Sequence, residues 1–282
     1  MIPPHLLERI PLLADGAPGD WLAAQHKGLG GIAESVNLRR PEWVQAGHDA
    51  FYKAGSRALR TNTAQANAVT LAAQELEERC EAINNSAMAL LRAAVGQQAL
   101  AMGSVGPIAA SVPLPDRERA YAQQVVYLCD TGSDFILLDG FSDVVEAMLV
   151  RRLALSAGDA PVLALLQADA AGLTLDGRPL ADAMQQLGDA GCDAVGALFT
   201  VTAEAEAPVD LQPLVEPLLD LGLPSAVFLG GATPGALSPA GYAARLAPLA
   251  RLRTVILGGG RHIGPAHVAA LAQHVTPTEK DA

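Results

Sequence analysis

Asp15 and Asp139 are the first candidates for chemistry, because each lies near the end of a short apolar run that predicts a buried strand. If both side chains face the same edge of a sheet, the two carboxylates would bind an ammonium group or act in proton transfer. Either carboxylate would equally well cap the turn that follows its strand. The spacing alone leaves both interpretations open.

The glycine-rich segment 258–265 is a second candidate, because it closes an apolar run and leads into a helix with proline in its first turn. Free amides of Gly259 and Gly260, together with that helix N-terminus, would suit an anion such as phosphate. The segment matches no complete dinucleotide or P-loop motif, and glycines at a strand end also simply allow close packing. His262 and His267 are five residues apart, which is a poor spacing for two ligands on one helix face.

Other common sites are not indicated. The sequence contains no GxSxG elbow and no HExxH motif, which argues against the usual hydrolase centres. Cys80, Cys129 and Cys192 lie far apart without a CxxC pair, so their spacing predicts neither a disulfide framework nor a local zinc site.

The elements that must position these residues follow from an alternation of short apolar runs and segments of helical periodicity. Such alternation is typical of parallel strands covered by crossover helices. Eight strand–helix units without a linker fit a closed barrel better than an open sheet, so we predict an α/β fold, a single-domain (β/α)₈ TIM barrel. The predicted strands are residues 11–17, 56–63, 98–104, 135–141, 161–167, 194–200, 225–231 and 254–260, and the predicted helices are 66–95, 116–131, 144–157, 180–190, 211–221, 240–247 and 265–274.

We predict that the barrel covers residues 1–275 and that the polar residues 276–282 form a frayed tail. Segment 16–40 contains several glycines and ends before a proline, so we expect an elaborated loop over the barrel mouth. Functional side chains of such barrels gather at the carboxyl ends of the strands. The residues expected there include Asp15, Asn62, Ser104, Asp139, Phe199, Gly259, Gly260, Arg261 and His262.

The charge balance of the chain restricts the classes of partner that it can bind. The chain of 282 residues carries 19 Lys and Arg against 30 Asp and Glu, a net charge of −11. This charge repels phosphate backbones and anionic lipid, so we expect neither nucleic acid nor a membrane as partner. No apolar run approaches the roughly 18 residues of a membrane span, and no signal peptide is indicated, so we expect a cytoplasmic protein.

Several motifs, taken in order, resemble the homocysteine S-methyltransferase family. The motifs are Asp15-Gly16-Ala17, Glu34-x-x-Asn37-Leu38, Thr61-Asn62-Thr63, Gly103-Ser104-Val105-Gly106-Pro107 and Leu257-Gly258-Gly259 with Pro265 and His267. The resemblance spans nearly the whole chain. It implies a TIM barrel that binds an amino-acid substrate, with Asp15 matching the family's first aspartate and Asp139 standing where a glutamate contacts the substrate ammonium group.

The resemblance also implies a zinc site of three cysteines, at the ends of the sixth and eighth strands. Phe199, Gly260 and Arg261 stand at those positions, and none of them supplies a thiolate. Zinc in such a site binds the substrate sulfur and favours thiolate over thiol. We therefore predict that the zinc site is lost, that no cofactor is used, and that Phe199 fills space once open to sulfur.

Two functions remain open. In the first, the diverged barrel transfers no methyl group and binds a small amine- or carboxylate-bearing, amino-acid-like ligand, or a partner subunit. In the second, Arg261, aided by His262, stabilises a thiolate or another anionic nucleophile without metal, because a fixed cation lowers the pKa of a nearby thiol. The methyl donor would then come from a separate corrinoid- or folate-binding protein subunit.

Overall fold

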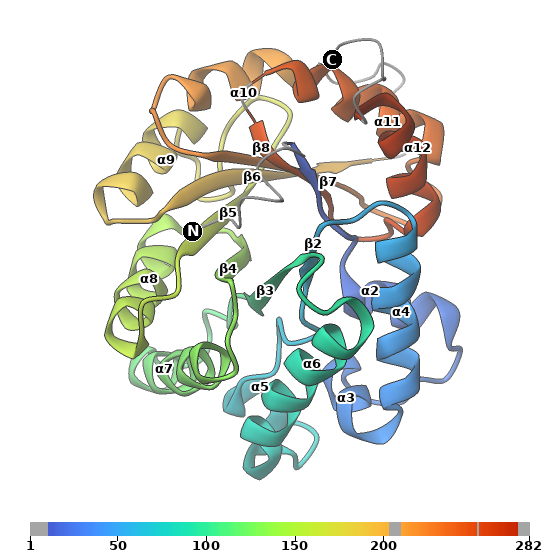
Figure 1. The fold of residues 1–282 in the computed structure, drawn as a ribbon. Helices are drawn as coiled ribbons and strands as arrows, with labels where there is room; N and C mark the ends of the chain where they lie inside the picture. The colour runs from blue at the N-terminus through green and yellow to red at the C-terminus, as the bar shows by residue number, and fades with distance from the viewer. Residues whose placement is uncertain (1–10, 203–209, 253, 276–282) are drawn as a thin grey trace.

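The computed structural model describes residues 11–202, 210–252 and 254–275. Within them, eight parallel strands form one sheet in the order β1-β8-β7-β6-β5-β4-β3-β2. A parallel bridge between Ala14 and Ala58 joins the two outer members of that order and closes the sheet into a cylinder. Figure 1 shows the helices as a ring around it. The predicted TIM barrel is confirmed.

All eight predicted strands are present, although the first two are shorter than predicted. Beyond β1 the chain turns into the mouth, and at Gly16 the backbone passes so close to Ile263 that an added Cβ would lie 1.9 Å from its carbonyl oxygen. The strands are β1 (Leu12–Leu13), β2 (Ala58–Arg60), β3 (Leu100–Val105), β4 (Phe135–Phe141), β5 (Val162–Ala168), β6 (Ala194–Val201), β7 (Ser225–Gly231) and β8 (Thr254–Gly259).

The helices follow the predicted pattern with one correction, and α4 is a helix that the predicted ranges did not include. The single helix predicted over 66–95 is divided into α5, a short 3-10 turn and α6, because the backbone of Glu75 adopts a left-handed φ of 56° that no α-helix accommodates. The helices are α2 (Pro18–Gln25), α3 (Val36–Arg39), α4 (Pro41–Lys53), α5 (Ala68–Ala72), α6 (Cys80–Val95), α7 (Leu114–Asp130), α8 (Val144–Ala157), α9 (Leu180–Asp189), α10 (Gln212–Leu219), α11 (Pro239–Leu246) and α12 (Pro265–Val275).

None of the helices in the described part of the chain combines the length and apolar character that crossing a bilayer requires. The predicted elaborated loop at 16–40 contains α2, a 3-10 turn (Ala33–Ser35) and α3. The predicted frayed tail, 276–282, lies outside the described residues.

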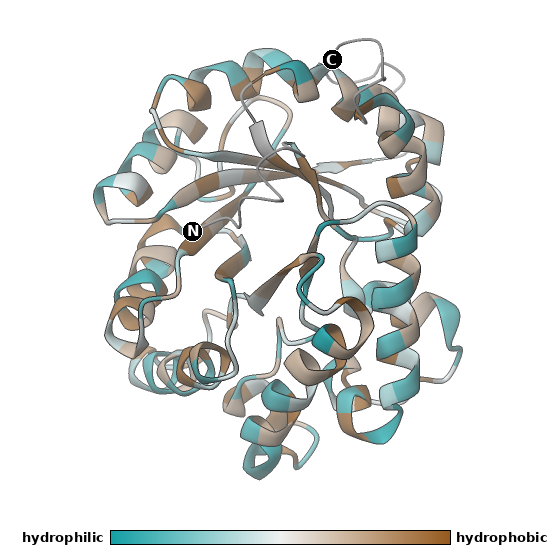
Figure 2. Cartoon of the chain, in the orientation of Figure 1, coloured by the Kyte–Doolittle hydropathy of each residue, from teal (hydrophilic) through white to brown (hydrophobic). Residues whose placement is uncertain are grey.

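Two apolar cores lie on the two sides of the sheet. The inner core is made only of strand and strand-end residues, among them Met102, Leu137 and Phe228, and the larger outer core lies between strands and helices. Figure 2 shows mainly hydrophobic colour along the strands and a mixture of hydrophilic and hydrophobic colour on the surrounding helices. Because side chains alternate along a strand, the residue two positions beyond an inner core residue also points into the cylinder, nearer its mouth.

Candidate functional site

Three charged side chains meet where β1, β2 and β4 end. Arg60 closes β2 two positions beyond the inner core residue Ala58, so its side chain points into the cylinder. Asp139 lies on β4 two positions beyond the inner core residue Leu137. Asp15 lies just beyond β1, where its Oδ2 atom accepts a hydrogen bond from the backbone N–H of Arg60 at 3.0 Å.

The Arg60 guanidinium holds the three groups together. Its Nε atom donates to Asp15 Oδ1 at 3.1 Å, and its Nη1 atom is 3.3 Å from Asp139 Oδ2. Its Nη2 atom donates to the carbonyl oxygens of Asp15 and Gly259. The side chains of Arg60 and Asp15 are 1% and 0% exposed, whereas that of Asp139 is 12% exposed. Asp139 is thus the most exposed of the three charged side chains.

Burial and charge act against each other in this cluster. Burial raises the pKa of Asp15 to about 6, while the charge and hydrogen bonds of Arg60 oppose the rise. Burial alone would lower the pKa of Arg60, but the charges of Asp139 and Asp15 outweigh it and raise that pKa above its ordinary value. One cation therefore faces two carboxylates, and with both carboxylates ionised the cluster carries one net negative charge.

Ser104 completes the cluster by holding Asp139. Its hydroxyl donates to Asp139 Oδ2 at 3.0 Å. Its own backbone is fixed, because its N–H donates to Thr61 Oγ1 and its carbonyl accepts from Thr63 Oγ1. The predicted mouth residues Asp15, Ser104 and Asp139 thus do come together.

Asn62 lies beside this cluster, but its side chain makes structural hydrogen bonds. Its Nδ2 atom donates to the Ala33 carbonyl and to Asn37 Oδ1, both at 2.9 Å, and Asn37 Nδ2 donates back to the Asn62 carbonyl at 2.8 Å. Asn62 is 2% exposed. These contacts fasten the 3-10 turn at Ala33 and the helix α3 to the end of β2.

Phe199 does not face the mouth. It packs in the outer core and lines a cavity of about 20 Å³ together with Leu211 and Leu229. Its neighbour Leu198 packs against the inner core instead, and a Cβ added to Gly260 would lie 2.8 Å from Leu198 Cδ1. Strand alternation therefore gives Leu198 the place at the mouth that we predicted for Phe199.

Arg261 lies at the rim. Its side chain is 68% exposed, and its Nε atom pairs with Asp20 Oδ2 at 3.2 Å. Arg60, which the sequence analysis did not single out, supplies the cation between Asp15 and Asp139. His262 follows Arg261 with a left-handed φ of 60° and a half-buried side chain.

The glycine amides predicted to cradle an anion already have partners. Gly259 N–H donates to the Asp15 carbonyl at 2.9 Å, and Gly260 N–H donates to the Leu229 carbonyl at 3.0 Å. Gly264 N–H donates to His267 Nδ1 at 3.1 Å. These glycines serve close packing, since a Cβ at Gly260 would meet both Leu198 and the backbone of β7.

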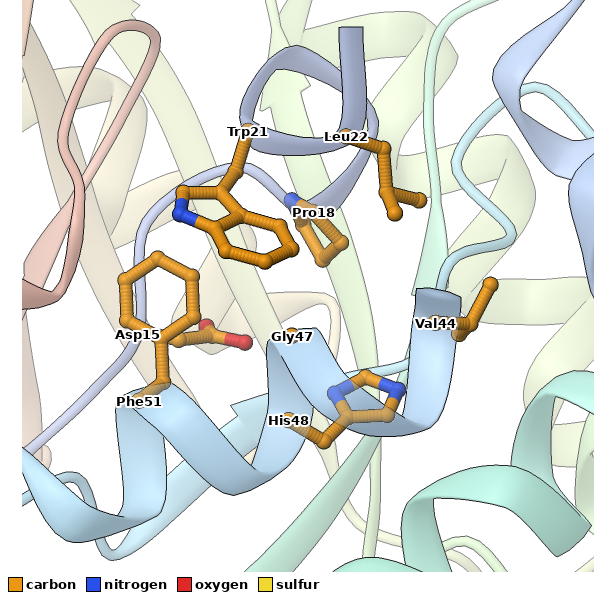
Figure 3. Close-up of a pocket in the computed structure, with 8 residues that line it drawn as sticks. All are labelled: Asp15, Pro18, Trp21, Leu22, Val44, Gly47, His48 and Phe51. Atoms are coloured by element: carbon orange, nitrogen blue, oxygen red, sulfur yellow. The ribbon is translucent and has the colours of Figure 1, made fainter. Parts of the chain in front are cut away.

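A cavity of about 10 Å³, the size of one water molecule, lies between α2 and α4 beside Asp15. Figure 3 shows Trp21 of α2 facing Gly47, His48 and Phe51 of α4 across it. His48 Nε2 is buried and has no hydrogen-bond partner among the described residues. Burial lowers the pKa of His48 to about 4, so the imidazole is neutral at pH 7.

None of the three cysteines belongs to the Asp15–Arg60–Asp139 cluster. Cys80 begins α6, Cys129 is in α7, and Cys192 precedes β6 at the amino end of the barrel. Burial raises the thiol pKa to about 11 for Cys80 and about 12 for Cys192. Among the residues that the structure describes, no three His, Cys, Asp or Glu side chains converge closely enough to hold a metal ion.

The sequence did carry one signal for Arg60. It is a charged residue inside the predicted strand 56–63, directly after Ala58-Leu59, at the position that shares a face with Ala58. A charge on the inward face of a buried strand needs partners of opposite charge, and the two candidate carboxylates were already known.

Comparisons with known proteins identify the family of the chain. Residues 12–275 match the family model described as homocysteine S-methyltransferase. The methionine synthase of Mycobacterium tuberculosis is 26% identical over 300 residues, which cover 96% of this chain and 25% of that protein. The methionine synthase of Mycobacterium leprae is 24% identical, with 96% and 24% covered. The chain thus spans about a quarter of the length of these relatives.

A solved structure supports the fold. The metallated form of the homocysteine methyltransferase MmuM from Escherichia coli matches with a TM-score of 0.76 at 24% identity. The match covers 96% of this chain and 98% of that chain.

Proposed function

This chain belongs to the homocysteine S-methyltransferase family, and we propose that its barrel mouth binds a small, amine-bearing, amino-acid-like ligand without the zinc site that the family resemblance implies. The observation that carries the proposal is the Arg60 guanidinium held between Asp15 and Asp139. In this proposal the chain is a diverged member that transfers no methyl group through zinc.

The charge of the cluster favours an amine. Asp15 and Asp139 outnumber Arg60, and Asp139 is the carboxylate that remains accessible from the mouth. A ligand ammonium group placed against Asp139 would complete the charge balance of the cluster. The half-buried Leu198 beside Gly260 offers an apolar contact to the rest of the ligand.

The same cluster supports the proposed absence of zinc. Arg60 carries a permanent positive charge that its two partners keep in place, and this charge repels a divalent cation nearby. Carboxylates are harder ligands than thiolates, so Asp15 and Asp139 are a poor substitute for the sulfur donors of a thiol-activating zinc.

Metal-free methyl transfer, with a donor from a separate corrinoid- or folate-binding protein, is the second candidate. It assigns the activating cation to Arg261, whose guanidinium is mostly exposed and paired with Asp20. We rank it second because Arg261 would first have to leave Asp20 and enter the mouth.

Isothermal titration of the whole chain with L-homocysteine, L-methionine and N-acetyl-L-methionine tests the proposal. We expect the free amino acids to bind and N-acetylation to weaken binding about tenfold or more, since a buried charged hydrogen bond is worth about 1.5–3 kcal/mol. Asp139→Asn should weaken binding similarly, and the exposed Asp159→Asn serves as the matched control.

Metal analysis of the same preparation supplies the opposing outcome. One zinc ion per chain, together with methylation of homocysteine, would overturn the proposal. Equal binding of L-methionine and its N-acetyl derivative would overturn the role given to Asp139.

A further inference from the structure

A cleft of about 310 Å³ lies outside the barrel mouth, in the segment that leads from α2 to α4. Its volume is at the lower end of the range for small-molecule sites. It shares no lining residue with the Asp15–Arg60–Asp139 cluster. The lining residues are Gly28, Leu29, Val36, Arg39, Arg40 and Trp43.

Arg39 is held in position by the loop before it. Its Nη2 atom donates to the carbonyls of Leu29 and Gly30, at 3.3 and 2.6 Å, and to Ser35 Oγ at 2.7 Å. The loop has the shape that these bonds need because Gly28 and Gly30 adopt φ values of 80° and 60°. Within the described residues, the Nε and Nη1 atoms of Arg39 make no hydrogen bond, so they remain available to a ligand.

Trp43 positions the second arginine. The Cζ atom of Arg40 lies 5.6 Å from the centroid of the Trp43 ring, within the range of a cation–π contact. The His26 ring stacks on the same indole at a centroid distance of 3.7 Å and an interplanar angle of 4°. These contacts restrain Trp43 and the guanidinium of Arg40, which lines the same cleft as Arg39.

Neither member of this pair has a carboxylate partner, whereas some surface arginines elsewhere are neutralised, as Arg119 is by Asp116 and Arg152 is by Glu118. Neither Arg39 nor Arg40 forms an ion pair with any carboxylate in the described ranges. In a chain with a net charge of −11, two adjacent exposed arginines form a local positive site.

We propose that this cleft binds a small organic anion. Its phosphate or carboxylate group pairs with Arg40, whose planar guanidinium matches two oxygens at once, and accepts a further hydrogen bond from a free donor of Arg39. Its apolar part lies against Leu29, Val36 and the edge of Trp43. The site is separate from the amine-binding mouth and does not depend on the function proposed there.

Titration with phenyl phosphate at low salt, followed by calorimetry, tests the proposal, with inorganic phosphate as the comparison probe. We expect one phenyl phosphate per chain, bound at least about tenfold more tightly than inorganic phosphate because the ring adds apolar contact. Binding should weaken as salt is added, since the contact is partly exposed.

Arg40→Ala should reduce the affinity for phenyl phosphate about tenfold or more, and Arg79→Ala removes an exposed arginine elsewhere as the matched control. Arg40 is exposed, so we expect the variant to fold, and its thermal unfolding midpoint verifies this. Equal affinity for phenyl phosphate and inorganic phosphate would overturn the proposed apolar contact. An Arg40→Ala variant that folds and binds phenyl phosphate like the parent protein would overturn the site.

Discussion

The Nε atom of Arg60 donates to Oδ1 of Asp15 over 3.1 Å, and both side chains are almost completely buried. Removing Arg60 leaves the charge of Asp15 uncompensated in an environment that water does not reach, whereas removing Asp15 leaves Arg60 paired with Asp139. Pairs of this kind are costly to break, even though forming them adds little net stability.

Arg60→Leu should therefore lower the free energy of unfolding by about 3–5 kcal/mol, because Asp15 and Asp139 lose their shared cation. Chemical denaturation measures this loss. Arg261→Ala is the control, since its pair with Asp20 is exposed and should contribute less than about 1 kcal/mol. Equal losses in the two variants would contradict the role assigned to Arg60.

Asp15 and His48 line the same cavity, and burial moves their pKa values in opposite directions. The pKa of Asp15 rises from 3.8 to about 6, so folded Asp15 holds its proton more firmly than the unfolded chain does. Its contribution to stability is fully present below about pH 4 and is lost as the pH rises to about 6. The pKa of His48 falls from 6.5 to about 4, so its contribution is lost as the pH drops through that range.

Replacing one of the two residues should leave only the contribution of the other to the pH dependence of stability. Relative to the parent protein, His48→Gln should gain stability at pH 4 compared with pH 7, by up to about 3 kcal/mol, and Asp15→Asn should show the opposite trend. Denaturation at several pH values measures how the free energy of unfolding of each variant changes with pH. The same pH dependence in both variants would rule out this assignment.

Leu198 and Phe199 should respond differently to truncation. Phe199→Ala should cost about 3–5 kcal/mol of stability and leave ligand preference unchanged, because the ring packs in the outer core. Leu198→Ala should cost less, because this side chain is only half-buried, and should shift the mouth toward ligands with a larger apolar part. Denaturation combined with titration of the amino-acid series separates the two effects, and a change of preference in Phe199→Ala alone would contradict the assignment.

Gly47 should resist substitution although it lies within a helix. An alanine Cβ there would be 2.8 Å from the rigid ring of Trp21, so we expect Gly47→Ala to lower stability by about 1–3 kcal/mol. At Gly188 in α9 the corresponding contact is the flexible end of Leu223, and the helix gains up to about 1 kcal/mol from alanine. Gly188→Ala should therefore be neutral or stabilising, and thermal unfolding of both variants provides the comparison.

Periodicity predicted the barrel well because its strands are buried on both faces and read as continuous apolar runs. The prediction was wrong within 66–95, where Glu75 takes a conformation that its side chain does not reveal. The short β1 could not be predicted either, since the turn after it depends on the distant backbone of Ile263.

The candidate site was predicted in part. Asp15, Ser104 and Asp139 meet as expected from their places at strand ends. A continuous apolar run does not show which of two adjacent residues points inward, so Phe199 was placed where Leu198 lies. Whether an exposed arginine turns toward a mouth or toward a nearby carboxylate such as Asp20 depends on tertiary structure that spacing does not contain.

The bonds from Arg60 Nη2 to the carbonyls of Asp15 and Gly259 have a structural consequence, because they cross the seam of the barrel. β1 and β2 are joined there by one bridge, between Ala14 and Ala58, and a side chain supplies hydrogen bonds that a longer ladder would otherwise make. The same guanidinium thus links the strands that close the barrel and contributes the positive charge at its mouth. We therefore expect that a change of ligand during evolution of this lineage would replace residues next to Arg60 and keep Arg60 itself.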